Sequence, residues 1–550
     1  MTKIKYLSIY ITSFLLVCMI TLMSFAYQMD NSAIASARDF SSYKNVLVIV
    51  TDHELNYQHG TANDTYGIQR PNYDEFVSSG VEFVNAKSVN PLCSPARRSL
   101  LTGLYPHQHG IIHNSVNVPV YPNVDTIYDV LLENSFPKDN AYFYGKTHYS
   151  GSSMDKDTPQ YSYGINGWST PGYGQPYKTQ EYKDYLARNN YFGSDYRSPV
   201  MVIEEDSLSP NGRPAKGETF DVANMGIITG NIFGIMQAPK EFHEAFFLAD
   251  MVNTELKSIA KSNSDEPFVM SVNIWGPHHP YYPTQEYVDL YTDENGVIGG
   301  NIEEYPSFND PFINKPKVYA WDNSEKGTDN PSLPTPNEKD WETFRTYMAL
   351  AYAQTTMVDE AVGTILDTLD ETGLADDTLV IWTNDHGDAL GAHGGHADKE
   401  CYMIEEILDI QLAVRDPSRP DLAGTKNTAL VNTNDVPVTM LDAMGLSFDY
   451  EVPGMSLLDL MYGEVAPRQY MVCTTNGHFS DTRARTVYFG DYKYTYYTND
   501  IDELYNLKED PFEMTNLIFE KDKQGIINLM KNMLYNWQIE QRDNIPLINI

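Results

Sequence analysis

Cysteine is scarce in this chain: its 550 residues include only 4, namely Cys18, Cys93, Cys401 and Cys473. So few cysteines in so large a protein exclude the disulfide frameworks typical of small secreted domains. Removal of an N-terminal segment would take Cys18 with it. The sequence alone does not decide whether Cys401 and Cys473 form a disulfide bond. We also find no internal repeats and no low-complexity tract.

Basic residues are few as well, at 38 lysines and arginines against 75 aspartates and glutamates, which gives a net charge of −37. Such an acidic chain does not bind nucleic acid or anionic lipid nonspecifically, so we expect neither as a partner. The charge also opposes long-range attraction of a highly sulfated polymer. A local cationic pocket can outweigh this global field, so the charge constrains the substrate only weakly.

The N-terminus has the pattern of a segment that directs export. Basic residues at positions 3 and 5 precede an apolar run over residues 6–25, and small residues near positions 24–26 and 35–37 offer cleavage sites. We therefore interpret residues 1–37 as a signal peptide or an uncleaved N-terminal anchor. The remainder is expected to be periplasmic, extracellular, or membrane-anchored and facing outward.

Short apolar runs bounded by polar turns predict buried strands of a large, mostly parallel sheet with flanking helices, an α/β fold. These runs cover residues 46–50, 141–144, 268–274 and 379–382. Each is followed by a polar cluster, and these clusters contain Asp52 and His53, Lys146 and His148, His278 and His279, and Asp385 and His386. Ligands of open α/β sheets bind beyond the carboxyl ends of strands, so we expect the clusters to meet in one crevice.

The rest of the pattern predicts two domains, a large one over residues 43–465 and a small C-terminal α+β subdomain over residues 466–550. Apolar residues at three- and four-residue steps predict a long helix over residues 340–371. Alternating residues around Gly490 and Asp491 predict an antiparallel hairpin, and a helix is expected over residues 521–541. Segments 161–191 and 281–336 are predicted to be loops because Tyr, Gly, Pro and Asn dominate them without periodicity.

The most informative residue is Cys93. It begins the pattern Cys-x-Pro-x-Arg, which continues into Leu-Thr-Gly, and Tyr105-Pro-His-Gln-His-Gly110 follows closely. This pattern resembles the maturation and active-site motif of type I sulfatases, which have an alkaline phosphatase-like fold. The segment from Glu503 to Glu513 resembles their C-terminal subdomain.

The resemblance implies that Cys93 is oxidised to formylglycine, whose hydrate is the nucleophile. The partner for that step would be a formylglycine-generating enzyme or an anaerobic sulfatase-maturating enzyme. Ser94 and Pro95 suit the start of a helix, which would place Cys93 at a helix N-terminus, where amide hydrogens favour an anion such as sulfate.

Asp52 and Asp385 follow separate strands, and converging carboxylates suit a hard divalent cation. A single such aspartate is also typical of helix caps and turns. The resemblance makes both residues metal ligands and adds the modified Cys93. The commonest sulfatase pattern has other residues where this chain has His53 and His386, and His386 matches a variant of choline sulfatases and phosphonate monoester hydrolases. We therefore include both histidines among the expected metal ligands, with a lining role as the alternative for His53. We expect Ca²⁺ because the carboxylates are hard oxygen ligands, with Mg²⁺ as an alternative. Mn²⁺ is a further alternative because imidazole suits Mn²⁺ better than Ca²⁺.

The resemblance also supplies roles for the cationic residues. Arg97 would hold the metal-bound nucleophile, while Lys146 and His148 would bind the sulfate and steady the formylglycine hydroxyl. His278, or His279 if the alignment is off by one, would contact the sulfate, and Lys399 would neutralise or protonate the leaving oxygen. His393 and His396 have no assigned role.

The sequence therefore predicts an exported hydrolase that converts a small-molecule or carbohydrate sulfate monoester to an alcohol and inorganic sulfate. One alternative is a phosphonate or phosphate ester hydrolase of the same superfamily. Another is an exported binding protein with a decayed site. The sulfated alcohol, the metal and the oligomeric state stay open.

Overall fold

A computed structural model describes residues 44–56, 67–114, 124–148, 163–165, 176–191, 199–204, 217–221, 233–262, 264–320, 341–478 and 480–548. The export segment predicted over residues 1–37 lies outside these residues. Among the described helices, none combines the length and the apolarity needed to cross a bilayer. The domain boundary predicted at residue 465 falls inside a compact unit from Tyr43 to Ile550 and stays a prediction.

An 8-stranded sheet with the order β11-β2-β10-β9-β1-β8-β3-β4 forms the centre of this unit. All neighbouring strands are parallel except β10, which runs antiparallel to β9 and β2, so the mostly parallel sheet is confirmed. The strands are β1 (Asn45–Asp52), β2 (Val81–Lys87), β3 (Ala141–Lys146), β4 (Tyr163–Ile165), β8 (Val269–Pro277), β9 (Thr378–Asn384), β10 (Leu412–Arg415) and β11 (Thr425–Asn432). The four apolar runs correspond to β1, β3, β8 and β9.

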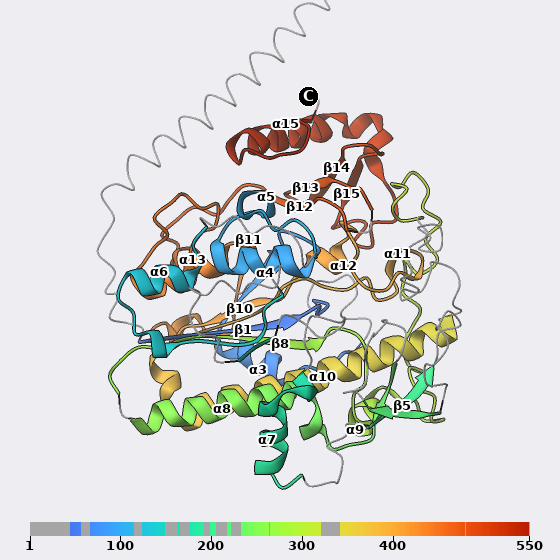
Figure 1. Cartoon of the computed structure of the whole chain (residues 1–550). Helices are drawn as coiled ribbons and strands as arrows, with labels where there is room; N and C mark the ends of the chain where they lie inside the picture. Colours follow the sequence, from blue (N-terminus) through green and yellow to red (C-terminus); the bar gives the residue numbers. More distant parts are fainter. Residues whose placement is uncertain are drawn as a thin grey trace, which may run out of the picture. The chain divides into compact units, whose positions relative to one another are not determined.

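Both faces of the sheet are covered, which explains why its central strands are apolar throughout. Leu47 and Ile49 of β1 pack into a core with residues of α8 and α10, whereas Val46, Val48 and Val50 pack into a second core with residues of α6 and α13. Figure 1 shows α8 and α10 on one side of the sheet and α4, α6 and α13 on the other.

The helices include the predicted long one, α10, and a C-terminal one, α15. Their bounds are α3 (Pro71–Ser79), α4 (Cys93–Thr102), α5 (Pro106–His109), α6 (Ile127–Glu133), α7 (Gln180–Arg188), α8 (Glu244–Ser262), α9 (Gln285–Val288), α10 (Trp341–Glu371), α11 (Ala392–Gly395), α12 (Glu405–Leu408), α13 (Asp435–Ala443), α14 (Leu457–Tyr462) and α15 (Gln524–Glu540).

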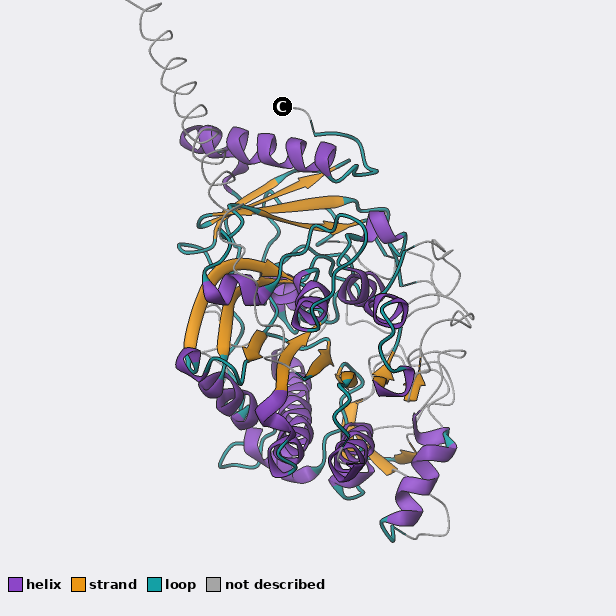
Figure 2. Cartoon of the chain, turned by 90° about the vertical axis from the view of Figure 1, so that its left-hand side faces the viewer, coloured by secondary structure: helices purple, strands orange, loops and turns teal. Residues whose placement is uncertain are grey.

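A 4-stranded antiparallel sheet follows near the C-terminus, with the order β12-β13-β14-β15. Its strands are β12 (Met471–Thr475), β13 (Ala484–Phe489), β14 (Tyr492–Tyr497) and β15 (Glu503–Asn506), and the β13–β14 pair confirms the predicted hairpin. Figure 2 shows α15 lying against this small sheet. A 3-stranded sheet contains β5 (Pro199–Glu204), β6 (Thr219–Asp221) and β7 (Phe233–Met236).

The structure corrects one expectation from the sequence, confirms a second and answers a question that was left open. The loop predicted over residues 161–191 is wrong for α7, in which Tyr182, Tyr185 and Leu186 are buried on one side and Thr179 accepts a hydrogen bond from the backbone N–H of Tyr182. Helix α4 begins at Cys93, which confirms that this residue stands at a helix N-terminus, and Pro95 fits the first turn because the N–H groups there have no partner within the helix. Cys401 and Cys473 are not joined by a disulfide bond, which closes the question of a bridge.

Candidate active site

The polar clusters predicted to converge lie at the ends of four adjacent strands. Strands β9, β1, β8 and β3 are consecutive and mutually parallel in the sheet, so their carboxyl ends share one edge. The segment after β2 reaches the same edge, since the Ser88 hydroxyl donates to the backbone carbonyl of Asp385 at 2.6 Å. Helix α4 starts from this segment and brings Cys93 to the edge.

Cys93 is fully buried and surrounded by cations. Its Sγ lies 3.1 Å from Nε2 of His386, and His148 hydrogen-bonds to it. Burial alone would raise the pKa of Cys93, but the positive charges of Lys146, Lys399 and His386 hold that pKa well below its usual range. The position of Sγ is therefore one where negative charge is stabilised.

Two buried carboxylates lie beside Cys93 and are held by cations. Nη2 of Arg97 donates to Oδ1 of Asp52 at 2.9 Å, and Nζ of Lys146 donates to Oδ2 of Asp52. Burial opposes ionisation, but Lys146 and Arg97 hold the pKa of Asp52 below its usual range. Nε of Arg97 also lies 2.9 Å from Oδ2 of Asp385, so this one guanidinium joins both carboxylates.

Four of these residues form a group that could hold a metal ion. One ligand atom from each of Asp52, Cys93, Asp385 and His386 lies within 4.8 Å of all the others. Oδ2 of Asp385 is buried and makes an ion pair, but no aligned hydrogen bond, with Nε of Arg97, and Nδ1 of His386 donates to the Gly387 carbonyl at 2.9 Å, which leaves Nε2 for a ligand. Carboxylate oxygens with one imidazole fit a divalent cation.

His53 lies beside this group rather than in it. Its backbone N–H donates to Oδ1 of Asp385 at 3.0 Å, while its ring belongs to a neighbouring cluster with His278 and His279. Nε2 of His53 is 3.4 Å from a carboxylate oxygen of Asp388. Burial lowers the pKa of His53 well below its usual value, so the ring is neutral. Its assignment as a metal ligand stays a prediction.

The side chains of Lys399 and His278 contact each other in the site. Nζ of Lys399 lies 3.2 Å from Nε2 of His278 and donates to Oδ1 of Asp398 at 2.8 Å. Burial would lower the pKa of Lys399, but the charges of Asp398 and Cys93 raise it above its ordinary value. Lys399 is therefore an ammonium with a fixed position.

Sequence reasoning missed several residues of this site. Asp388 and Asp398 contact the histidines and Lys399, and the position of Asp398 directly before Lys399 was an available signal. His113 and His478 were missed as well, because they come from segments with no local chemical motif. Asn114 was missed too: its Oδ1 accepts a hydrogen bond from the backbone N–H of Ser94 at 2.9 Å.

His393 and His396, which have no assigned role in catalysis, make structural contacts. Nδ1 of His393 lies 3.0 Å from Oδ2 of Asp310 in a buried cluster that also contains Lys315. Nε2 of His396 lies 2.8 Å from the backbone carbonyl of Tyr319. Both histidines therefore attach the loop after β9 to residues 310–319.

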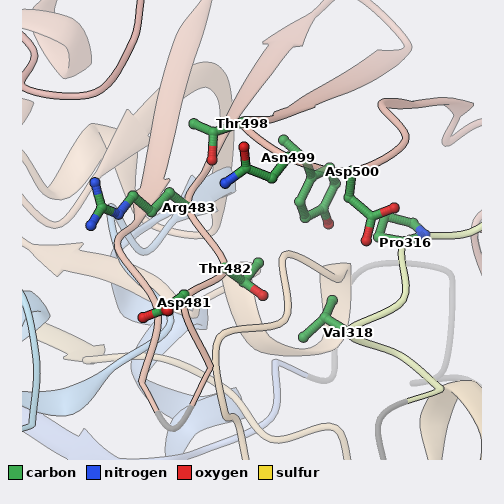
Figure 3. A pocket seen from close by; sticks show the side chains of 9 residues that line it. Pro316, Val318, Asp481, Thr482, Arg483, Thr498, Asn499 and Asp500 are labelled. Carbon is green, nitrogen blue, oxygen red and sulfur yellow. The ribbon is translucent and has the colours of Figure 1, made fainter.

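A separate cavity of about 220 Å³ lies between the hairpin of the small sheet and residues 316–318. Figure 3 shows Asp481, Thr482 and Arg483 on one side of it and Thr498, Asn499 and Asp500 on another. None of the candidate catalytic residues lines this cavity.

Comparison with known proteins identifies the family. Residues 44–446 match the sulfatase family, and residues 391–540 match the C-terminal region of N-sulphoglucosamine sulphohydrolase. The choline-sulfatase of Rhizobium meliloti is 25% identical over 495 residues, which cover 86% of this chain and 82% of that protein. The Delta 4,5-hexuronate-2-O-sulfatase of Bacteroides thetaiotaomicron is 24% identical over 529 residues, covering 92% and 91%.

Among solved structures, the phosphonate monoester hydrolase of Agrobacterium radiobacter is similar in fold. It superimposes with a TM-score of 0.68 at 18% identity, covering 90% of this chain and 96% of that one. This likeness confirms the alkaline phosphatase-like architecture predicted from the sequence. Because the family match spans most of the chain, the protein belongs to the sulfatase family and is a sulfuric ester hydrolase.

Proposed function

We propose that this protein is an exported sulfatase that uses a formylglycine made from Cys93 and one divalent metal ion to hydrolyse a sulfate monoester. The observation that carries the proposal is the close grouping of Asp52, Cys93, Asp385 and His386, with one ligand atom of each within 4.8 Å of the others, at the start of the helix that bears the Cys-x-Pro-x-Arg motif. A maturating enzyme would be its partner before catalysis.

Asp52, Asp385 and His386 would hold the metal, together with an oxygen of the modified residue 93. When bound, the metal polarises the sulfate and lowers the pKa of a coordinated hydroxyl. Ca²⁺ is our first choice because two carboxylates supply hard oxygen ligands, with Mg²⁺ or Mn²⁺ as alternatives. Arg97 pairs with both carboxylates and offsets the repulsion between their negative charges.

The protein's own cations would neutralise the sulfate ester before attack. In this proposal the Sγ atom of Cys93 marks where the formylglycine hydroxyls stand, and Lys146 and Lys399 already stabilise negative charge there. One hydroxyl releases its proton to solvent and attacks sulfur, and the bond between sulfur and the alcohol oxygen breaks with its electron pair on that oxygen. Lys399, 3.2 Å from His278, gives a proton to the departing alkoxide.

His148 would complete the turnover. Burial and the charge of Lys146 lower its pKa to about 4, so the ring is neutral and able to accept a proton. It removes the proton of the remaining hydroxyl on residue 93, the carbon–oxygen bond to sulfate breaks, and the electron pair leaves with inorganic sulfate. The aldehyde is restored and adds water again.

The test is to purify the protein from hosts with and without a formylglycine-generating enzyme. We expect the tryptic peptide of residues 88–97 to be lighter than its thiol form and reactive as an aldehyde, and 4-nitrophenyl sulfate to be hydrolysed only by the modified protein. Full activity with an unmodified Cys93 would contradict the proposal.

A second candidate activity is hydrolysis of phosphonate or phosphate monoesters. It is favoured by His386, which matches a variant of phosphonate monoester hydrolases, and by the fold shared with such an enzyme. Comparing kcat/KM on 4-nitrophenyl sulfate with that on a 4-nitrophenyl phosphonate monoester separates the two candidates. A higher value on the phosphonate would favour the second.

A further inference from the structure

A buried group of possible metal ligands shares no residue with the candidate active site. It consists of His393 in α11, Glu406 in α12 and Glu513 after β15, and one ligand atom of each lies within 4.8 Å of the others. The exposed fractions of these residues are 1%, 6% and 2%. Buried carboxylates need compensation, and the sulfate chemistry does not explain why these three side chains face each other.

Asp310 determines which nitrogen of His393 is free. Nδ1 of His393 lies 3.0 Å from Oδ2 of Asp310, and Nζ of Lys315, also 3.0 Å from Nδ1, donates to that same carboxylate oxygen. Burial would raise the pKa of Asp310, but His393 and Lys315 lower it to about 2, so the carboxylate is ionised. Because an ionised carboxylate can only accept, Nδ1 carries the proton and Nε2 has a free electron pair. A carboxylate that holds an imidazole in this way is typical of histidines that bind metals.

The free nitrogen of His393 faces an oxygen that also has a free electron pair. Nε2 lies 3.7 Å from Oε2 of Glu406, and in the part of the chain that the structure describes neither atom has a hydrogen-bond partner. Burial and the charge of Lys315 lower the pKa of His393 to about 3, so the two residues do not form an ion pair. A shared proton would hold the two atoms about 2.8 Å apart. Two ligands of a tetrahedral Zn²⁺, each at about 2.1 Å, are about 3.4 Å apart, so the observed separation is closer to that of a metal site.

The carboxylates at this gap have too few cations nearby. Lys493 pairs with Glu513 at 2.8 Å and with Glu405 at 3.1 Å, whereas no lysine or arginine among the described residues pairs with Glu406. Burial raises the pKa of Glu513 to about 8, and the charges of Glu405 and Glu406 add to this effect, so Glu513 keeps a proton when no ion is bound. A divalent cation would replace that proton. Any dependence of stability on pH through Glu513 therefore belongs to the metal-free protein.

We propose that His393, Glu406 and Glu513 bind one divalent transition-metal ion, Zn²⁺ or Mn²⁺, that is distinct from the catalytic metal. One imidazole with two carboxylates fits these ions better than Ca²⁺. His393 and Glu406 follow β9 of the large sheet, whereas Glu513 follows β15 of the small sheet, so the ion joins the two sheets. Its role is structural, and it does not depend on the proposed sulfatase function.

The experiment measures the zinc content and the melting temperature of the full chain produced in medium with added Zn²⁺. Asp385→Asn serves as the background, so that Zn²⁺ at the catalytic group is not counted, and a parallel series in the unaltered chain covers a failure of that variant to fold. We expect about one Zn²⁺ per chain after dialysis, measured by mass spectrometry of the metal. His393→Gln and Glu406→Gln should lower this content at least about tenfold.

The melting temperature separates a metal ligand from a merely structural contact. Protein produced with a chelator should melt about 3 °C lower than the zinc-loaded protein, and this difference should vanish in Glu406→Gln. In the chelator-treated protein Glu406→Gln should not lower the melting temperature, because it removes a buried charge without changing the shape of the side chain.

His396→Gln is the matched control. His396 is three residues after His393 and equally buried, but its Nε2 lies 2.8 Å from the Tyr319 carbonyl and it contributes no atom to the group. This variant should keep its Zn²⁺ even where it melts lower. If His393→Gln fails to fold, Glu406→Gln carries the test.

A wild-type chain that holds no transition metal after growth with Zn²⁺ or Mn²⁺ would overturn the inference. So would folded His393→Gln and Glu406→Gln variants with the metal content of the parent chain. Neither result affects the proposed function, which depends on the aldehyde at residue 93 and on turnover of a sulfate ester.

Discussion

At the scale of single residues, the site is an assembly of buried charges that are stable only together. The carboxylates of Asp52 and Asp385 are buried away from solvent, and the positive charges of Arg97 and Lys146 compensate their negative charges. Removing one member of such a set leaves the others unpaired in a region of low dielectric, which is costly. Substitutions here therefore affect folding as well as chemistry, and isosteric changes are the more informative ones.

Asp385→Asn keeps the shape of the side chain and removes one negative charge. We expect bound metal to fall and kcat/KM on 4-nitrophenyl sulfate to drop by roughly 100-fold or more, since the proposed metal ligand and its electrostatic effect are lost. Metal analysis together with steady-state kinetics checks this. Asp449→Asn, at an exposed position, is the control. Unchanged turnover in Asp385→Asn would contradict the metal-dependent mechanism.

Lys399→Ala should reveal whether this residue protonates the leaving oxygen. A nitrophenolate departs readily without a proton, whereas an alkoxide does not, so the loss should be about 10-fold on 4-nitrophenyl sulfate and about 1000-fold on an alkyl sulfate. The dependence of kcat/KM on leaving-group pKa should steepen in the variant. Equal losses on both esters would assign Lys399 to sulfate binding alone.

At the scale of elements, close contact between strands positions the site. Gly145 pairs with Asn273 across β3 and β8, has a φ of 99°, and a Cβ added there would lie 1.9 Å from the Asn273 carbonyl oxygen. Only glycine allows this approach, and Lys146 is the next residue. The glycine therefore determines where the lysine that binds Asp52 is placed.

Gly145→Ala should push β3 away from β8 and displace Lys146. We expect a loss of about 2–4 kcal/mol in the free energy of unfolding, since strain at positive φ adds to overpacking, together with a large loss of kcat. Gly373→Ala is a matched control, because Gly373 has a φ of 74° but nothing within 4 Å of its added Cβ, so only about 1 kcal/mol is expected. Equal effects on melting temperature in both variants would contradict the packing argument.

The elements also show which parts of the fold and of the site could be predicted from the sequence. The strands β1, β3, β8 and β9 were predictable because sheets covered on both faces need continuous apolar runs, and the polar residues at their ends followed from the parallel arrangement. Helix α7 was missed because its buried face is made of Tyr182 and Tyr185, which look like loop residues in a Tyr-rich segment. His478 could not be predicted, because its position depends on β12 contacting Val89 and Asn90, nearly 400 residues earlier.

At the scale of the whole molecule, buried acidic residues join the C-terminal strands to the main sheet. Nζ of Lys493, in β14, pairs with Glu513 at 2.8 Å and with Glu405 at 3.1 Å. Burial raises the pKa of Glu513 to about 8, and its neighbours Glu405 and Glu406 add to the effect of burial. Acids outnumber lysines in this cluster, so one carboxyl retains its proton in the folded state.

The contribution of Glu513 to the free energy of unfolding should therefore decline as the pH rises from about 4.5 to about 8. The folded state holds the Glu513 proton more tightly than the unfolded state, so the stabilisation is complete below pH 4.5 and is lost as the pH passes the folded pKa of about 8. Glu513→Gln should flatten this part of the curve of melting temperature against pH. A curve of unchanged slope in that variant would assign the dependence to other groups.

The complete burial of Cys93 bears on whether this residue would be modified before or after the chain folds. A maturating enzyme cannot reach a side chain with no exposed surface, so the conversion of Cys93 that we propose would have to occur before the chain has folded around it. Strand β12, which binds the segment just before Cys93, is synthesised some 380 residues after it. Under the proposed function, Cys93 would therefore stay accessible to a maturating enzyme while these residues are made, and pairing of β12 with the segment before Cys93 would help to end that access.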